Sequence, residues 1–258
     1  MKTALITGAY GAIGKAIARQ LSNKGFLTVL IGRDELRLKK ATEEVKKETR
    51  NENVFHEVVD LSRKESIKSF ALRWNQPADI LINNAASSPE KRLETPEGIE
   101  LQFATNVLGY FWMTIFFKEF MIGLEDARIV NVASYWAGGL DLDDLEFKKR
   151  IYDNDASYRQ SKQANRMLTV AFAEKLKLYG ITVNACHPGD VNSKLSNELG
   201  FGGHETPDQG AFTPVWVATE PTLKNTTGKY FENMLVVRCP FGQNMTSINR
   251  LYEICGKY

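Results

Sequence analysis

The opening of this chain passes from a strand pattern to a helix pattern through a glycine-rich turn, and this junction limits the folds available to it. Residues 3–7 form a short apolar run, and a helical pattern extends from Ala12 to Gly25. The turn between them reads Gly8-Ala9-Tyr10-Gly11-Ala12-Ile13-Gly14. Its glycines permit a tight turn, so that the first amides of the helix can face a pyrophosphate. Glycine after a strand also serves packing alone, but its place at the first strand-to-helix junction favours dinucleotide binding.

The alternation of strand and helix patterns continues along the chain. Strand patterns cover residues 27–32, 54–59, 79–82, 128–132, 181–185 and 229–236, and helical patterns cover residues 35–50, 98–121, 158–179 and 208–219. Alternating units predict a doubly wound α/β fold of three layers, in which a parallel sheet binds its ligands at the carboxyl edge of the strands. The length of 258 residues and the hydrophobic content of 43% suit a single domain over residues 1–258.

The end of the second strand pattern indicates which nicotinamide cofactor is bound. Gly32-Arg33 stands where the residue that reads the ribose 2′ position is expected. An arginine there attracts a 2′-phosphate, whereas an acidic side chain would repel it, so Arg33 predicts NADP(H) in preference to NAD(H). Asp34 is the counterargument, and we interpret it as the N-cap of the helix over residues 35–50.

Two further strand ends carry residues that suit a cofactor. Asp60-Leu61 follows the third strand, where Asp60 could hold adenine or could carry out ordinary turn chemistry. Ser62 and Glu65 have the spacing of a capping box for the next helix. The fourth strand opens into Asn83-Asn84-Ala85-Ala86, whose small and amide side chains suit close contact with a ribose.

Tyr158 and Lys162 provide candidate acid/base chemistry. They are four residues apart, so on a helix they share one face, and the ammonium group lowers the pKa of the phenol. Such a phenol can exchange a proton in a carbonyl/alcohol interconversion. An isolated Y-x-x-x-K is more often a pair of surface residues. The catalytic interpretation therefore depends on two further candidate residues. Ser134 could hold a substrate oxygen or form a turn, and Asn106, among apolar residues, could be a satisfied core amide that bends its helix.

Composition excludes several other functions. Lys and Arg outnumber Asp and Glu by only 33 to 31, so the chain lacks the excess of basic residues that is typical of a nucleic-acid-binding protein. The amino terminus enters the first strand directly, which predicts no signal peptide. The apolar run 111–124 is interrupted by Lys118 and Glu119 and is too short for a membrane anchor, so we expect a buried core or interface helix. The three cysteines, Cys186, Cys239 and Cys255, are odd in number and far apart, which predicts a reducing, cytoplasmic setting. The three histidines, His56, His187 and His204, show no ligand spacing with them, which predicts no structural metal.

Two segments are candidates for lining the substrate site. Residues 135–154 are polar and contain an acidic cluster, which predicts a solvated loop or short helix beside the site; the cluster is Asp141, Asp143, Asp144 and Glu146. Residues 190–210 are glycine-rich and polar, which predicts the loosest part of the chain and a candidate substrate lid.

In combination, these residues resemble the short-chain dehydrogenase/reductase family over essentially the whole chain. The matching positions are Thr7-Gly8 to Gly14, Asn83-Asn84-Ala85-Ala86, Asn106, Ser134, Tyr158 with Lys162, and Pro188-Gly189. Residues 158–165 together with His187-Pro188-Gly189 look like the retinol dehydrogenase and WW-domain oxidoreductase branch. The resemblance implies a single Rossmann-type domain and a catalytic tetrad.

The resemblance also implies a role for each site residue. Tyr158 would transfer the proton, Ser134 would bind the substrate oxygen, Lys162 would lower the Tyr158 pKa and bind ribose, and Asn106 would hold a water in a proton relay. The implied cofactor contacts are Gly8, Tyr10, Gly11, Ala12, Ile13, Gly14, Arg33, Asp60, Leu61, Asn84, Ala85, Tyr158, Lys162, Pro188, Gly189, Val191 and Ser193. Three positions depart from the family pattern: Ala12 at the usual middle glycine, Ala86 at a usual glycine, and Ser193 at a usual threonine.

The sequence therefore predicts an NADP(H)-dependent oxidoreductase that interconverts a carbonyl and an alcohol, with an aldehyde or ketone as its small-molecule substrate. The alternative is a cofactor-binding regulator or scaffold without turnover, which a complete tetrad disfavours. An isomerase or dehydratase of the extended branch, where the Gly11 spacing also occurs, is disfavoured because the chain has no second substrate domain. The helices from Gly98 and Ser157 could form a homodimer face, or they could supply the core of a monomer.

Overall fold

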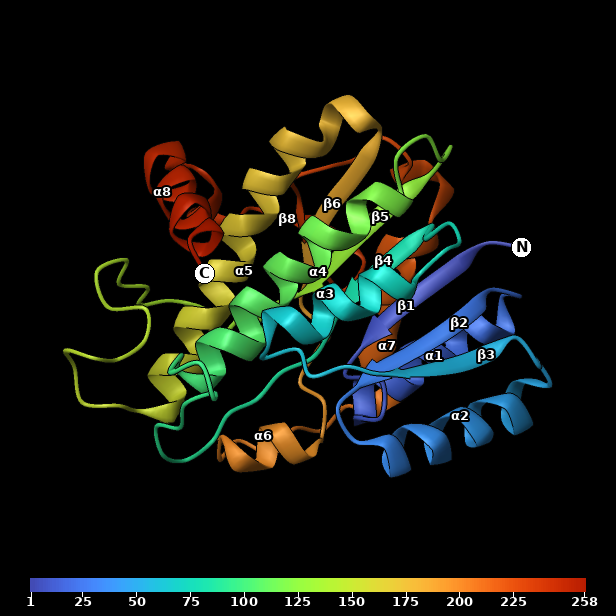
Figure 1. Cartoon of the computed structure of the whole chain (residues 1–258), viewed down its shortest axis with the longest axis horizontal. Coiled ribbons are helices and arrows are strands. Elements are labelled where there is room, and N and C mark those ends of the chain that lie inside the picture. The colour runs from blue at the N-terminus through green and yellow to red at the C-terminus, as the bar shows by residue number, and fades with distance from the viewer.

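Eight strands form one sheet in the order β3-β2-β1-β4-β5-β6-β7-β8 in the computed structural model, which describes residues 1–258 (Figure 1). The strands are β1 (Thr3–Thr7), β2 (Leu27–Gly32), β3 (Val54–Val58), β4 (Ile80–Asn83), β5 (Ala127–Val132), β6 (Ile181–Cys186), β7 (Tyr230–Glu232) and β8 (Leu235–Val237). All neighbours pair in parallel except β7 and β8, which are antiparallel. The order reverses between β1 and β4, where doubly wound sheets open a crevice for ligands.

Helices cover both faces of the sheet and give the predicted three layers. One face carries α1 (Ala12–Asn23), α2 (Glu35–Thr49) and α7 (Pro207–Thr219), and the other carries α3 (Lys64–Arg73), α4 (Gly109–Phe117) and α5 (Asn154–Leu176). Shorter elements are α6 (Lys194–Glu198), the π-helix η1 (Phe103–Leu108), and 3₁₀ turns at Lys118–Phe120, Lys177–Tyr179, Pro221–Leu223 and Pro240–Gly242. Every residue of β1, β5 and β6 is buried, as expected for central parallel strands.

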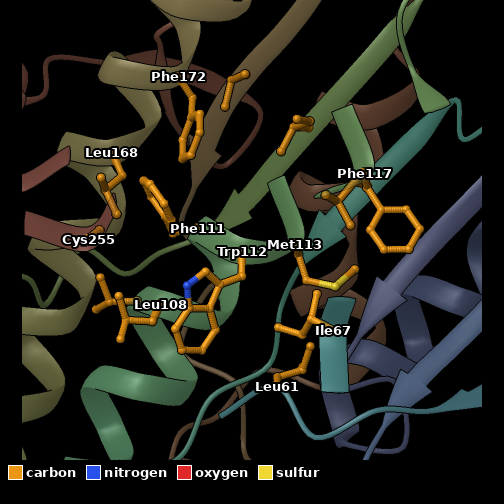
Figure 2. Close-up of a cluster of buried hydrophobic side chains, with 14 of the residues drawn as sticks. Leu61, Ile67, Leu108, Phe111, Trp112, Met113, Phe117, Leu168, Phe172 and Cys255 are labelled. Carbon is orange, nitrogen blue, oxygen red and sulfur yellow. The ribbon is translucent and has the colours of Figure 1, made fainter. Parts of the chain in front are cut away.

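The apolar run that begins at Phe111 is a core helix, as predicted. Figure 2 shows side chains of α4 packed against α5 and α3 in the larger core, with Phe111 tilted against Phe172 at 5.3 Å between ring centroids. Phe117 contacts Phe70 in the same way at 4.9 Å. None of the helices is long and apolar enough to span a lipid bilayer.

The single helix predicted over residues 98–121 is divided in the structure. It begins with η1, which widens the helix around Asn106, and ends in a 3₁₀ turn after Phe117. A Cβ at Gly109 would lie only 2.7 Å from the Leu61 carbonyl oxygen, so the chain passes closely here. Periodicity alone did not reveal this division, because nearly every residue of η1 and α4 is buried and the run has no polar face that would show a change of register.

The carboxyl-terminal region also differs from the prediction of one strand over residues 229–236. The segment is a hairpin whose turn, Asn233-Met234, has φ values of 50° and 61°. A two-residue turn with positive φ is the common hairpin connection, but Asn-Met lacks the glycine that normally identifies it. The helix α8 (Met245–Gly256) follows and was not predicted.

Helix α8 packs on the outer side of α5 (Figure 1). Its Tyr252 ring meets Phe111 and Phe172 edge-on, with centroid distances of 5.1 Å and 5.3 Å. The apolar side chains of α4 and α5, considered above for a homodimer face, thus have a partner within the same chain.

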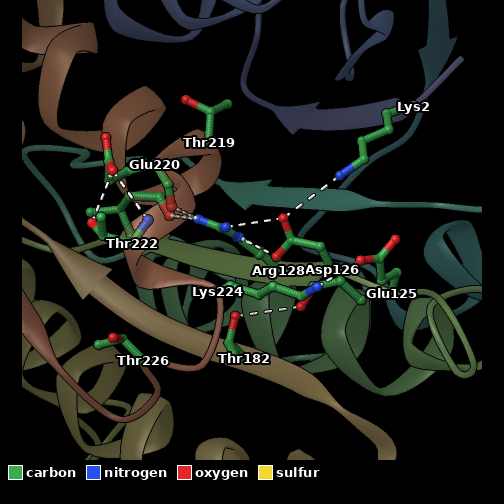
Figure 3. A network of polar contacts seen from close by, with 12 residues as sticks. Lys2, Glu125, Asp126, Arg128, Thr182, Thr219, Glu220, Thr222, Lys224 and Thr226 are labelled. Carbon is green, nitrogen blue, oxygen red and sulfur yellow. Dashed lines mark hydrogen bonds and ion pairs between the residues drawn. The ribbon is translucent and has the colours of Figure 1, made fainter.

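A buried cation fixes the amino edge of the sheet. Arg128 at the start of β5 donates to both carboxylate oxygens of Asp126, at 2.7 Å and 3.0 Å, and to the Val217 and Glu220 carbonyls, at 3.2 Å and 2.8 Å (Figure 3). These carbonyls end α7, whose last turn has no intrahelical donors for them. Arg128 therefore joins β5 to α7 at the edge opposite the candidate site.

The two cap predictions had different outcomes. Asp34 is the N-cap of α2 and accepts from the Arg37 amide at 3.0 Å, which confirms that prediction. The capping box of Ser62 and Glu65 is wrong, because α3 begins after Arg63 with no side-chain cap. The Ser62 hydroxyl instead donates to Asp60 Oδ1 at 2.7 Å, which is the nearer acceptor in the preceding turn.

We predict that Leu251→Ala, in α8, lowers the free energy of unfolding by about 2–4 kcal/mol, because it leaves a cavity in the core. Leu251 is fully buried in the same cluster as Phe111. Urea denaturation measures the effect, and Glu253→Ala on the exposed side of α8 is the control. A loss below about 1 kcal/mol would show that α8 is only loosely attached.

Candidate active site

The turn after β1 fits a pyrophosphate in its tight backbone and its free amides. Gly8 has φ +65°, and a Cβ there would lie 2.7 Å from the Ala85 Cα, so the turn lies directly against the end of β4. The N-cap Gly11 offers no side chain, and the first turn of α1 has no acidic residue. The amides of Ala12, Ile13 and Gly14 therefore face outward without a protein anion to satisfy them. This is the donor set that a phosphate group needs.

Thr7 holds the turn in this position, although sequence reasoning did not single out its side chain. Its hydroxyl accepts from the amides of Asn84 and Ala85 at 2.8 Å and 3.1 Å. Asn84 in return donates its Nδ2 to the Thr7 carbonyl at 2.9 Å. The Asn84 amide, predicted to contact ribose, thus joins two strand ends. A threonine directly before the glycine turn was the available signal.

The end of β2 presents two guanidinium groups. Arg33 is exposed, and Arg37 lies over the Tyr10 ring at 4.4 Å from its centroid. The Tyr10 ring is in turn pressed against Gly32, where a Cβ would lie 2.5 Å from it. With Asp34 engaged as the cap of α2, the charge at this strand end is predominantly positive.

Two predicted cofactor contacts have local structural partners. Asp60 Oδ1 accepts from the Ser62 amide at 3.0 Å in addition to its hydroxyl, which is the turn chemistry considered as an alternative. Ser193 accepts from the Ser196 amide at 3.1 Å and begins α6. Both side chains are therefore positioned by the backbone at the carboxyl edge, where Leu61 and Val191 are buried beside them.

The structure brings Ser134, Tyr158 and Lys162 together at the end of β5. Tyr158 and Lys162 share one face of α5 and are 7% and 2% exposed. The Lys162 Nζ donates to the Val132 carbonyl at 2.9 Å and lies 5.5 Å from the centroid of the Tyr158 ring. Ser134 follows two residues after Val132; its hydroxyl accepts from the Trp136 amide at 3.0 Å and lies near enough to the phenol to affect the Tyr158 pKa. Tyr158 and Lys162 are therefore buried and are not a pair on the protein surface.

Burial determines the protonation of these groups. It raises the pKa of Tyr158 well above its usual range, and the Ser134 hydroxyl lowers that pKa by less. Burial also lowers the pKa of Lys162 to about 7. In the protein alone, Tyr158 is thus a neutral phenol at neutral pH, and the lowering of its pKa predicted from Lys162 is not found: burial raises it, and Ser134 is the one group that lowers it.

Asn106 is fully buried and its amide is engaged by protein groups. Its Oδ1 accepts from the Ser87 amide at 2.8 Å, and its Nδ2 donates to the Ser87 carbonyl at 2.9 Å. Nδ2 also lies 3.3 Å from the Ser161 hydroxyl, which donates to the Tyr158 carbonyl at 2.7 Å. The satisfied core amide considered from the sequence is therefore present, and it reaches the backbone of Tyr158 through Ser161.

The two predicted substrate loops meet across the site. Trp136 contacts Phe201 edge-on at 5.0 Å between centroids, and Tyr135 contacts His187 at 4.6 Å. The description of residues 135–154 as solvated is wrong for Asp144, which is buried. Its carboxylate accepts from the amides of Lys148, Lys149 and Arg150 at 2.7–3.1 Å, and these donors replace water.

Arg166 supports the site from the side of β7 and was not predicted. It follows Lys162 by the same four-residue spacing and is buried. Its guanidinium lies 3.6 Å from the centroid of the Tyr230 ring, and Nη1 is 3.5 Å from the Ser134 carbonyl. The continued spacing Tyr158-Lys162-Arg166 was the signal available in the sequence.

His187 gives the site a dependence on acid. Burial lowers its pKa from 6.5 to about 4, although Glu232 and Asp190 raise it and Arg166 lowers it further. Below pH 6.5 the unfolded chain binds a proton that the folded chain excludes, so stability falls as the pH decreases from about 6.5 to about 4.

We therefore predict that the wild type loses about 2 kcal/mol more than His187→Phe between pH 7 and pH 4.5. Phenylalanine preserves the contact with Tyr135 but cannot titrate. Urea denaturation at the two pH values measures the difference. The exposed His204, replaced in the same way, is the control and should leave the pH dependence unchanged. Parallel pH profiles for the wild type and His187→Phe would contradict the assignment.

Comparison with known proteins agrees with this geometry. A family model described as short chain dehydrogenase matches residues 2–201. Retinol dehydrogenase 13 of Mus musculus is 33% identical over 253 residues, covering 90% of this chain and 76% of that protein. Retinol dehydrogenase 12 of Homo sapiens is 34% identical over 268 residues, covering 98% of this chain and 84% of that protein. A crystal structure of an uncharacterised protein from Mycobacterium Paratuberculosis superposes with a TM-score of 0.83 at 26% identity, covering 100% of this chain and 94% of that chain. The chain therefore belongs to the short-chain dehydrogenase family, in the branch that contains the retinol dehydrogenases.

Proposed function

We propose that this protein is an NADP(H)-dependent enzyme that reduces an aldehyde or ketone to an alcohol. The observation that carries the proposal is the buried group of Ser134, Tyr158 and Lys162 at the carboxyl edge of β5. A glycine turn with unsatisfied amides lies at the same edge, at the end of β1. Members of this oxidoreductase family interconvert carbonyls and alcohols, and the arrangement provides the two groups that this chemistry requires of the protein.

The protein supplies orientation and a proton. The Ser134 hydroxyl donates to the carbonyl oxygen of the substrate, and Tyr158 donates the proton that this oxygen needs as it becomes a hydroxyl. Because the pKa of Tyr158 is raised, the phenol carries its proton at neutral pH and is in the form that can donate it to the substrate oxygen. The bound cofactor supplies the hydride.

Lys162 and Asn106 position the proton donor. The bond from Lys162 to the Val132 carbonyl fixes the ammonium beside the phenol, where it is also available to a ribose hydroxyl. Asn106 acts on the Tyr158 backbone through Ser161. Its role in a water relay remains a prediction from the family resemblance.

The preference for NADP(H) is supported by the charge at the end of β2. Arg33 and Arg37 are exposed there; of the two acidic neighbours, Asp34 is the cap of α2 and Glu35 lies in the first turn of that helix. A 2′-phosphate would find charge-assisted donors, whereas a free 2′-hydroxyl would find no dedicated carboxylate.

The proton donor is tested with Tyr158→Phe. We expect turnover with NADPH to fall by about a thousandfold or more, with NADPH affinity within about twofold of the wild type, because only the phenolic hydroxyl is removed. NADPH oxidation across a panel of aldehydes and ketones measures turnover, and fluorescence titration measures binding.

Tyr252→Phe, which makes the same change in α8 away from the site, is the matched control and should retain full activity. Turnover by Tyr158→Phe equal to that of this control would refute the acid/base role.

The cofactor preference is tested with Arg33→Ala. We expect NADPH binding to weaken by about tenfold to a hundredfold and NADH binding to change by less than about twofold, because only NADPH carries the 2′-phosphate. Isothermal titration with both cofactors measures this, with Arg73→Ala at the exposed end of α3 as control. Equal effects on the two cofactors would exclude Arg33 as the discriminating residue.

A further inference from the structure

The carboxylate of Glu205 lies against the backbone of Gly189 without a hydrogen-bond partner. Gly189 follows β6 and has φ +105°, and a Cβ at this position would collide with Glu205 Oε2. The Oε2 atom is buried and has no hydrogen-bond donor within the protein. Glu205 as a whole is half-buried, so Oε2 is the part of the side chain that is shielded from water. A carboxylate oxygen shielded from water without a donor is costly.

The position of Glu205 is fixed by its backbone on both sides. Its amide donates to the Asp190 carbonyl at 2.9 Å, and its carbonyl accepts from the Asn192 amide at 3.0 Å. Helix α7 begins two residues later and is bound to α1, where Gln20 donates to the Asp208 carbonyl at 2.9 Å. The side chain is therefore held against Gly189 by the fold and is not a mobile surface group.

Glu205 faces the part of the edge where the proposed chemistry takes place. The Ala133 amide donates to the Cys186 carbonyl at 2.8 Å, so the end of β6 adjoins Ser134. The glycine turn lies at the other side of the edge, at the start of α1. A dinucleotide bound at that turn by its pyrophosphate must extend toward Ser134 for hydride transfer, and so its reactive end reaches the neighbourhood of Gly189.

The chemistry of that reactive end complements an unpaired carboxylate. A nicotinamide ring carries an amide group with N–H donors, and its oxidised form is positively charged. Either feature would satisfy Glu205 Oε2, and the positive charge distinguishes the two oxidation states of the cofactor.

We propose that Glu205 is a cofactor-positioning residue that accepts a hydrogen bond from the nicotinamide amide and selectively stabilises the oxidised ring. This inference rests on the proposed function, since it requires a nicotinamide cofactor at this edge. It makes the protein bind NADP⁺ more tightly, relative to NADPH, than it would with a neutral residue at position 205.

Binding of the two oxidation states by Glu205→Gln tests the proposal without any substrate. Quenching of tryptophan fluorescence gives the Kd of NADP⁺, and the fluorescence of the cofactor gives the Kd of NADPH. We expect NADP⁺ to bind about tenfold more weakly to the variant and NADPH to change by less than about twofold. Glu205→Asp keeps the charge and should retain most of the wild-type ratio.

Stability without cofactor provides a second, independent readout. Because the variant removes the negative charge from an oxygen that is shielded from water and has no donor, cofactor-free Glu205→Gln should unfold at a higher temperature than the wild type. Glu198→Gln is the matched control, since Glu198 lies in the same loop and is paired with Lys194 at 3.4 Å. This control should leave both Kd values and the ratio unchanged.

The outcomes separate this inference from the proposed function. Unchanged Kd values for both oxidation states, or an equal loss for both, would overturn the role of Glu205 while leaving NADP(H) binding established. A wild-type protein that binds neither form would overturn the proposed function and this inference together. A selective loss of NADP⁺ affinity with a raised unfolding temperature is the expected result.

Discussion

A buried ammonium group joins the two elements on which the candidate active site depends. Lys162 on α5 is 2% exposed, and its one hydrogen bond to the protein goes to the Val132 carbonyl at the end of β5. Because a buried amine without an acceptor is costly, this bond ties α5 to the end of β5. Tyr158 lies one turn earlier on the same face of α5, and Ser134 lies two residues beyond Val132. The phenol and the hydroxyl are therefore brought to the same place.

The same strand is fixed by a second buried cation at its other end. Arg128 donates to two carbonyls at the end of α7, so β5 is attached to a helix on each face of the sheet (Figure 3). The surroundings of the two cations differ in one respect. Arg128 has the carboxylate of Asp126 beside it, whereas burial without a carboxylate lowers the pKa of Lys162 to about 7. The paired cation serves structure, and the unpaired one is available for chemistry.

The sequence was most informative where structure is decided locally. The bounds of β1 and β2 and the cap at Asp34 agree with the prediction, because apolar runs, glycine and a capping aspartate act over a few residues. The family resemblance is confirmed for the same reason, since its motifs are short. The burial of Asp144 could not be predicted, because its donors are backbone amides of a loop without periodicity. Helix α8 was missed although Ile248, Leu251 and Cys255 form an apolar stripe at helical spacing, because this short stripe near the end of the chain was not assigned a packing partner, which the structure shows to be α5.

Residues that organise the protein differ from residues that could bind a ligand in whether their polar atoms have hydrogen-bond partners within the chain. Asn84 and Asp60, both predicted cofactor contacts, have hydrogen-bond partners within the chain and can be understood from the protein alone. At the end of β6, by contrast, His187 Nδ1 and Glu205 Oε2 are buried without partners. Each such atom costs about 1–3 kcal/mol until a donor or acceptor arrives. Free energy that the fold loses at these two atoms can be regained when a ligand satisfies them, so binding at the carboxyl end of β6 would stabilise the protein.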